Sequence, residues 1–294
     1  MVEPAWHAPR TIEEALAALD AVEGARPIAG GTDLAVRILS GEARPPAIVD
    51  LGRVPGLDSV TVSRPAHGVE RVEIGARVTH AAVAAHPFLR VRVPALAEAC
   101  ATVGSRQIRE RGTLCGNVAN ASPAADSAVA LLALDAAVTV RSARGGATEI
   151  PLESFLLGPG ETTLKRGELV TGVAFDCPSE GARGAYLKLG LRRALAIAIV
   201  SVAAVFEPGA GTVRIALGSA APTPVRARAA EELFAEEWHA ARGRGPQDRE
   251  VLMAEVARRA VHAARPVDDL RATAWYRSAM VEALTMDALE KAIT

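Results

Sequence analysis

The sequence predicts an α+β fold in two parts: a larger, two-lobed N-terminal domain and a small C-terminal antiparallel sheet packed by helices. Three observations carry this prediction. Short apolar strand-like runs alternate with helical runs through residues 1–177, three strand-like runs follow one another after Pro178, and three helical runs close the chain. A chain of 294 residues is long enough for one or two domains with an ample core.

The first lobe, residues 1 to about 52, is expected to run helix, strand, glycine turn, helix, strand. Pro27–Ala29 read as the end of a short apolar strand, and Gly30-Gly31 follow it. Asp33 or Thr32 can then cap a helix that runs to Gly41. A second strand is expected over 48–51.

The second lobe, residues 53–177, mixes strands and helices around one unusual loop. Between Gly104 and Pro123 the chain carries small and polar residues but few large apolar ones, and we expect neither helix nor strand there. The other expected elements are a strand over 69–74, helices near Thr79 and over 95–103 and 126–134, a hairpin of 137–141 with 147–150 turning at Gly145-Gly146, and a strand over 168–175.

The C-terminal domain, residues 178–294, is expected to place strands before helices. The strands are expected over 185–189, 197–206 and 212–217, and the helices over 225–234, 248–264 and 274–293. Residues 242–246 read as an exposed connector, because they hold two glycines and a proline.

Two glycine-bearing segments are the candidate functional sites. Arg26–Leu34 and Gly112–Pro123 both offer bare backbone N–H groups and small side chains. A helix that begins just after Gly30-Gly31 would favour a diphosphate at its N-terminus. Two such segments indicate one extended ligand that is bound from both sides. The alternative for the first segment is a tight strand-to-helix turn that binds nothing. The alternative for the second segment is a loop with a structural role only.

Ordered motifs along nearly the whole chain resemble those of one family, the flavoprotein (medium) subunits of molybdenum hydroxylases, which include xanthine dehydrogenase and aerobic carbon monoxide dehydrogenase. Besides the two glycine segments, the motifs are residues 11–15, 74–80, 104–109, 187–190, 198–203, 221–226 and 276–277. The resemblance implies an FAD-binding domain of the PCMH type, followed by a domain like the C-terminal domain of the carbon monoxide dehydrogenase flavoprotein.

The resemblance also implies roles for individual residues. The diphosphate would be held by the first segment, with backbone N–H groups of 29–32 as donors: Pro27, Ile28, Ala29, Gly30, Gly31, Thr32, Asp33 and Leu34. The facing wall would come from Gly112, Thr113, Leu114, Cys115, Gly116 and Asn117. Val103 would pack on the adenine or ribitol region, Asp126 would accept a hydrogen bond from a cofactor hydroxyl, Val170 would approach the flavin with its backbone, and Lys188 would reach the cofactor from the C-terminal domain.

Some of these residues have other interpretations or depart from the family pattern. Asp126 can instead be the N-cap of the following helix, and Lys188 can be a solvated strand lysine. Cys115 stands where the family commonly has the first of two glycines, and Glu110 where it commonly has asparagine. Thr32 replaces the histidine of the carbon monoxide dehydrogenase branch, which favours the xanthine dehydrogenase branch and makes a carbon monoxide substrate less expected.

The function that follows from the resemblance is electron transfer in a complex. A large molybdopterin-binding subunit would hydroxylate the substrate, and a small [2Fe-2S] subunit would pass electrons to non-covalent FAD on this chain, which would deliver them to NAD⁺ or another acceptor. The resemblance implies a dimer of heterotrimers. The sequence shows no convincing nucleophile, carboxylate pair or triad, so we expect no catalytic residue of its own.

Two alternatives remain open at this point. The chain could be a stand-alone FAD-dependent reductase or oxidase on the same cofactor fold, which would need its own acid in a substrate pocket. It could also be an interaction subunit without a cofactor, although such a chain would have no reason to keep two glycine segments.

Composition excludes several other classes. The net charge is −1 and only 3% of residues are aromatic, so there is no basic or stacking surface for nucleic acid. The longest apolar run, residues 194–206, is too short for a membrane span. Three widely spaced cysteines without a Cys-x-x-Cys pair predict neither disulfide nor metal nor iron–sulfur cluster, and a reducing, cytoplasmic location fits them.

Overall fold

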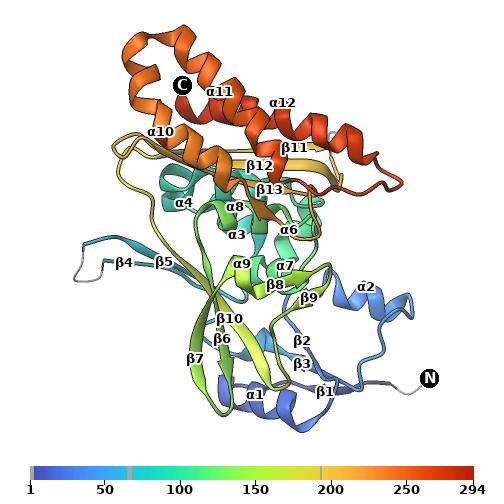
Figure 1. Ribbon diagram of the computed structural model, residues 1–294. Coiled ribbons are helices and arrows are strands. Elements are labelled where there is room, and N and C mark those ends of the chain that lie inside the picture. Colours follow the sequence, from blue (N-terminus) through green and yellow to red (C-terminus); the bar gives the residue numbers. More distant parts are fainter. Residues whose placement is uncertain (1–2, 65–67, 193) are drawn as a thin grey trace.

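The computed structural model describes residues 3–64, 68–192 and 194–294, and Figure 1 shows their arrangement. Within these ranges the strands form sheets of three, five, four and two strands. The sheets of three and five strands lie in the N-terminal part of the chain, and the four-stranded sheet lies in the C-terminal part. The predicted α+β fold is therefore confirmed.

The first lobe is a parallel sheet of order β1-β3-β2 with one helix packed on it. Thr11 caps that helix, because its Oγ1 accepts a hydrogen bond from Glu14 N at 3.1 Å, and the helix buries one apolar stripe against the sheet. The second helix buries no residue, and Gly41 after it has φ +79°. The elements are β1 (Ala5–His7), α1 (Ile12–Ala21), β2 (Arg26–Ile28), α2 (Leu34–Leu39), β3 (Ala47–Asp50) and η1 (Leu51–Arg53).

The second lobe is built on an antiparallel sheet of order β4-β5-β10-β6-β7. The predicted hairpin is present: residues 143–145 form its turn, and Gly146, whose φ of +69° suits glycine, begins the second strand. The strands are β4 (Val60–Ser63), β5 (Arg71–Gly75), β6 (Ala137–Ser142), β7 (Gly146–Pro151) and β10 (Glu168–Asp176), with β8 (Leu156–Gly158) and β9 (Glu161–Thr162) paired separately. The helices are α3 (His80–Ala85), α4 (Pro87–Arg92), α5 (Pro94–Thr102), α6 (Arg106–Arg111), α7 (Leu114–Ala119), α8 (Asp126–Ala133) and α9 (Leu152–Phe155).

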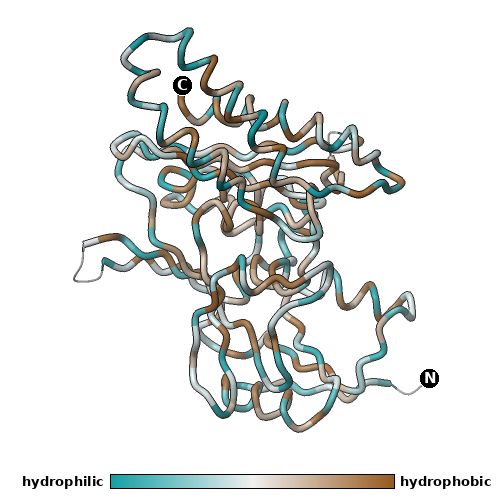
Figure 2. Tube along the Cα trace, in the orientation of Figure 1, coloured by the Kyte–Doolittle hydropathy of each residue, from teal (hydrophilic) through white to brown (hydrophobic). Residues whose placement is uncertain are grey.

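The C-terminal part is an antiparallel sheet of order β11-β12-β13-β14, covered on both faces (Figure 1). Helices α5 and α8 of the second lobe pack on one face. The first and last of the three long C-terminal helices pack on the other face, and the middle one packs on those two helices. Residues Ala198–Phe206 are all buried, which explains why this stretch is apolar apart from Ser201. The elements are β11 (Arg183–Gly190), β12 (Ala198–Glu207), β13 (Thr212–Gly218), β14 (Val225–Arg226), α10 (Arg228–Arg244), α11 (Pro246–Ala260), η2 (Val261–Ala263) and α12 (Ala274–Ile293). Along the outer helices apolar and polar stretches alternate, as expected for helices with one buried face (Figure 2).

Three expectations about local structure are wrong. The segment 104–123 contains two short helices, α6 and α7, because Ser105 and Thr113 each cap one through Oγ at 3.1 and 3.0 Å and the second buries an apolar face. Residues 225–226 form a strand rather than the start of a helix. Residues 242–244 continue α10, which ends only at Gly245, where φ is +131°.

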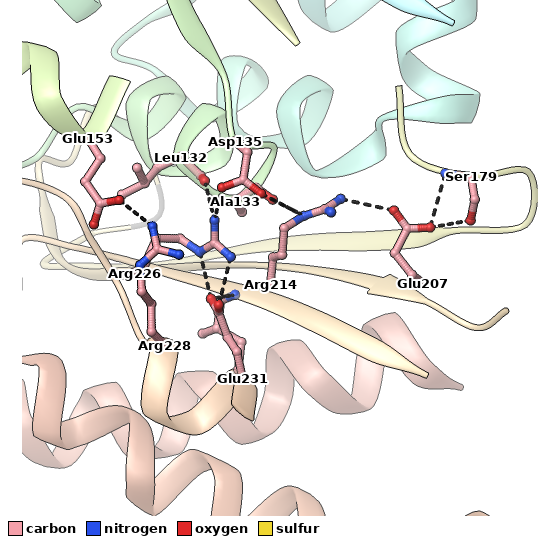
Figure 3. A network of polar contacts seen from close by, with 11 residues as sticks. Leu132, Ala133, Asp135, Glu153, Ser179, Glu207, Arg214, Arg226, Arg228 and Glu231 are labelled. Atoms are coloured by element: carbon pink, nitrogen blue, oxygen red, sulfur yellow. Dashed lines mark hydrogen bonds and ion pairs between the residues drawn. The ribbon is translucent and has the colours of Figure 1, made fainter. Parts of the chain in front are cut away.

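An arginine network ties α8 to the C-terminal sheet (Figure 3). The Arg226 guanidinium is 3% exposed and donates to both carboxylate oxygens of Glu231, at 2.7 and 2.8 Å. The same guanidinium donates to the Leu132 carbonyl at 3.3 Å and contacts Asp135, at the end of α8. Arg214 donates to the Ala133 carbonyl at 2.8 Å. The C-terminal sheet is thus fixed against the helix whose first residue is Asp126.

Candidate cofactor site

The two glycine segments meet in the structure. A Cβ added to Gly30 would overlap the Arg111 carbonyl oxygen and would lie 3.0 Å from Gly112 Cα. Only glycine therefore allows the first segment to lie this close to the backbone of the second. Residues 81 positions apart in the chain are therefore in contact at this point.

Gly112 is enclosed by groups from both lobes. A Cβ there would lie 3.1 Å from Thr32 Oγ1 and 3.5 Å from His80 Cδ2. His80 N donates to the Gly112 carbonyl at 2.9 Å, and Leu114 N donates to the Val78 carbonyl at 3.0 Å. These two bonds pair the start of α3 with the second glycine segment and hold it against the first.

The first segment leaves its donors free. Among the described residues, no hydrogen bond is donated by the backbone N–H groups of Ala29, Gly30, Gly31 or Thr32. Gly31 has φ +72°, a conformation that L side chains rarely adopt. Asp33 occupies the N-cap position of α2, but its side chain makes no capping bond there. A run of unpaired, adjacent N–H groups fits an anionic group such as a diphosphate.

A second group of predicted residues meets where α5, α8 and β11 come together. Lys188 Nζ donates to Asp126 Oδ2 at 2.6 Å and approaches the Thr102 carbonyl at 3.4 Å, next to Val103. The Asp126 and Lys188 side chains are only 6% and 11% exposed. Lys188 is therefore not a solvated strand lysine, and Asp126 is not an N-cap, because Ala125 occupies that position.

Tyr186 completes this buried cluster. Its hydroxyl donates to Asp126 Oδ1 at 2.6 Å, and the residue is 4% exposed. Burial raises the pKa of Asp126, while the charge and hydrogen bond of Lys188 and the hydrogen bond of Tyr186 oppose that shift. Burial and the neighbouring carboxylate raise the pKa of Tyr186 well above its usual value, so the phenol stays protonated. The sequence analysis missed Tyr186, although it lies two residues before Lys188 on one strand and so shares its face.

The remaining predicted residues differ in burial and in contacts. Leu114 and Cys115 are 0% and 2% exposed, and burial raises the pKa of the Cys115 thiol to about 12. Asn117 Oδ1 accepts a hydrogen bond from Ser127 Oγ at 2.7 Å, which links α7 to the residue after Asp126. Val170 is 5% exposed in β10, the strand on which α7 packs. Gly116 is exposed.

The chemistry of the site is that of binding. Burial and Arg109 lower the pKa of His80 to about 4, so this histidine, which is bonded to the second glycine segment at Gly112, is neutral at neutral pH. Across the described ranges, no three His, Cys, Asp or Glu side chains group closely enough to hold a metal ion. In the same part of the chain, no helix combines the length and hydropathy that a membrane span requires.

Two family models match the chain. "FAD binding domain in molybdopterin dehydrogenase" matches residues 2–176, and "CO dehydrogenase flavoprotein C-terminal domain" matches residues 185–292. The glyceraldehyde dehydrogenase medium chain of Sulfolobus acidocaldarius is 30% identical over 96% of this chain and 95% of its own. The nicotinate dehydrogenase FAD-subunit of Eubacterium barkeri is 35% identical over 66% of each chain.

A solved structure shares the whole fold. A carbon monoxide dehydrogenase of Hydrogenophaga pseudoflava, in a form that lacks the Mo-pyranopterin moiety of its molybdenum cofactor, contains a chain that superposes with a TM-score of 0.89 at 29% identity. The superposition covers 100% of this chain and 99% of that one.

Proposed function

Because this chain belongs to the family of FAD-binding medium subunits of molybdenum hydroxylases, we propose that it passes electrons from the [2Fe-2S] clusters of a partner subunit, through FAD, to NAD⁺ or another acceptor. The proposed assembly is a heterotrimer with a large molybdopterin-binding subunit and a small iron–sulfur subunit, present twice. Bound FAD supplies the ability to accept electrons singly and release them in pairs.

The observation that carries the proposal is the contact of Gly30 with the Arg111–Gly112 backbone, beside unpaired N–H groups. The first segment would bind the diphosphate through the N–H groups of residues 29–32. Thr113 and Gly116 would face it from α7. The segment holds no histidine, the residue to which a flavin could be covalently attached there, so the binding is expected to be non-covalent.

The buried cluster would bind a second part of the cofactor. A carboxylate can accept about four hydrogen bonds, and Asp126 uses one lone pair on each oxygen for Tyr186 and Lys188. It keeps acceptor capacity for a cofactor hydroxyl. Lys188 has three N–H donors, of which two point to Asp126 and Thr102. Its third donor has no partner among the described residues and could reach the cofactor near Val103.

The proposal is tested by placing a negative charge in the first segment. Gly31→Asp should abolish FAD retention, because a carboxylate would repel the diphosphate among the N–H groups that bind it. Gly56→Asp is the matched control: Gly56 has φ +77°, similar to +72° at Gly31, but nothing lies within 4 Å of its Cβ position. Flavin content is read from absorbance after purification of each full-length variant. Full flavin occupancy in Gly31→Asp would contradict the assignment of this segment.

A further inference from the structure

We propose that Tyr186 is a positioning residue of the cofactor site: its hydroxyl, supplied by the C-terminal sheet, orients the Asp126 carboxylate toward the cofactor hydroxyl. The inference rests on the proposed function, because Asp126 is assigned there to the cofactor. It adds a residue that contacts Asp126 and not the ligand. It also gives β11 of the C-terminal sheet a second contact with Asp126, beside that of Lys188.

The geometry fixes the direction of the hydrogen bond. Tyr186 Oη lies 2.6 Å from Asp126 Oδ1, and its raised pKa keeps the phenol a donor. Lys188 Nζ donates to the other carboxylate oxygen, Asp126 Oδ2, at 2.6 Å. Two donors on opposite oxygens determine the plane of the carboxylate, so the remaining lone pairs point in fixed directions.

Tyr186 is itself held from outside the cluster. Its backbone N–H donates to Glu98 Oε2 at 2.9 Å, and Glu98 Oε1 accepts a hydrogen bond from Lys291 Nζ at 2.7 Å. Helices α5 and α12 therefore set the position of β11 at this residue. The phenol is buried in the same apolar cluster as the core of the second lobe. A hydroxyl placed in that cluster costs free energy unless it has a partner, and Asp126 is that partner.

The alternative is that Tyr186 only fills space between the sheet and α5. A double-mutant cycle separates the two roles, because a positioning effect requires Asp126 and a packing effect does not. Tyr186→Phe removes only the hydroxyl, and Asp126→Asn keeps the shape of the side chain. The chain has one other tyrosine, Tyr276 on α12, which is more exposed than Tyr186. Tyr276→Phe is therefore the matched control.

The measurement is the FAD dissociation constant of the full-length apoprotein, determined by quenching of flavin fluorescence. Tyr186→Phe should raise this constant about tenfold in the natural background, and less than about twofold when Asp126→Asn is already present. Tyr276→Phe should leave it within about twofold. An unchanged constant in Tyr186→Phe, or the same factor in both backgrounds, would overturn the inference.

The pH dependence of FAD release gives a second readout that uses only the conservative variant. Loss of the Tyr186 donor should raise the pKa of Asp126, so FAD should be released at a higher pH on acidification. The other groups around this carboxylate are Lys188 on β11, the Thr102 carbonyl and the buried Cys100 thiol on α5, and Ser201, which pairs with Lys188 on β12. All of them stay in place in the variant. An identical release profile would contradict a positioning role.

Failure of FAD binding and failure of the positioning role give different results. If the natural protein does not bind FAD, the proposed function is wrong. If the natural protein binds FAD and Asp126→Asn binds it equally well, the FAD function stands, but Asp126 is not a cofactor ligand and Tyr186 positions nothing.

Discussion

Replacing Gly30 by alanine is the smallest change that tests the contact between the two glycine segments. The added Cβ would overlap the Arg111 carbonyl oxygen and lie 2.7 Å from its carbon, whereas ordinary contacts begin at 3.4 Å. The carbon alone requires the segments to separate by about 0.7 Å, and the nearer oxygen requires more; both partners at this contact are backbone, which cannot rotate away. Overpacking of this kind typically costs about 1–3 kcal/mol. If this free energy destabilises the FAD complex relative to the apoprotein, the affinity for FAD drops roughly 5- to 150-fold.

The assay is titration of the full-length apoprotein with FAD, alongside thermal unfolding without FAD. Gly209→Ala is the control, because nothing lies within 4 Å of the Cβ position at Gly209 and its φ is not positive. We expect Gly30→Ala to lose affinity and Gly209→Ala to keep it. An affinity for FAD in Gly30→Ala equal to that of the control would refute the idea that close approach of the two segments forms the site.

Two further predictions concern stability. Arg226→Ala should destabilise the protein by about 3–5 kcal/mol in urea unfolding, because it leaves the Glu231 carboxylate, only 12% exposed, without its bidentate partner. Arg228→Ala, on an arginine that is 55% exposed, should cost less than about 1 kcal/mol. Equal losses would mean that the network of Figure 3 does not join the domains. His80 has a folded pKa of about 4 against an unfolded 6.5, so its contribution to stability is complete above pH 6.5 and is lost as pH falls toward 4. His80→Asn should therefore remove up to about 3 kcal/mol of the acid-induced loss of stability in that window, and an unchanged slope of unfolding free energy against pH would contradict the assignment.

Local signals in the sequence predicted the elements that depend on local chemistry. The expected first helix is present as α1 and is capped by Thr11, the β6–β7 hairpin turns just before Gly146 as expected, and α12 has the predicted bounds. Each of these features is determined within a few residues, by a cap, a left-handed glycine or an apolar period of 3.6.

Elements that depend on distant partners were predicted less well. Helix α7 looked too rich in small polar residues to be helical, but Leu114, Cys115 and Val118 are buried against other elements and Thr113 caps it. The expected connector at 242–244 became helix because α10 packs on β13 and α11. The short strands β1, β4, β8, β9 and β14 and the helices α4 and α9 were not predicted.

In the candidate site, too, features set by local residues were predicted and features set by distant partners were not. The glycine segments were recognised from their own residues, but their contact at Gly30 depends on tertiary packing. Asp126 and Lys188 were assigned separately to the cofactor, and the structure shows that they also bind one another across 62 residues. Tyr186 was missed because its role depends on Asp126, 60 residues earlier, which sequence spacing alone does not reveal.

The most direct test of the central claim is the visible absorption spectrum of this chain, purified by a tag from its native host. We predict flavin bands overlaid with the broad absorption of co-purifying iron–sulfur clusters, and flavin that is released into solution when the protein is precipitated with acid. A colourless protein that cannot be reconstituted with FAD would contradict the account.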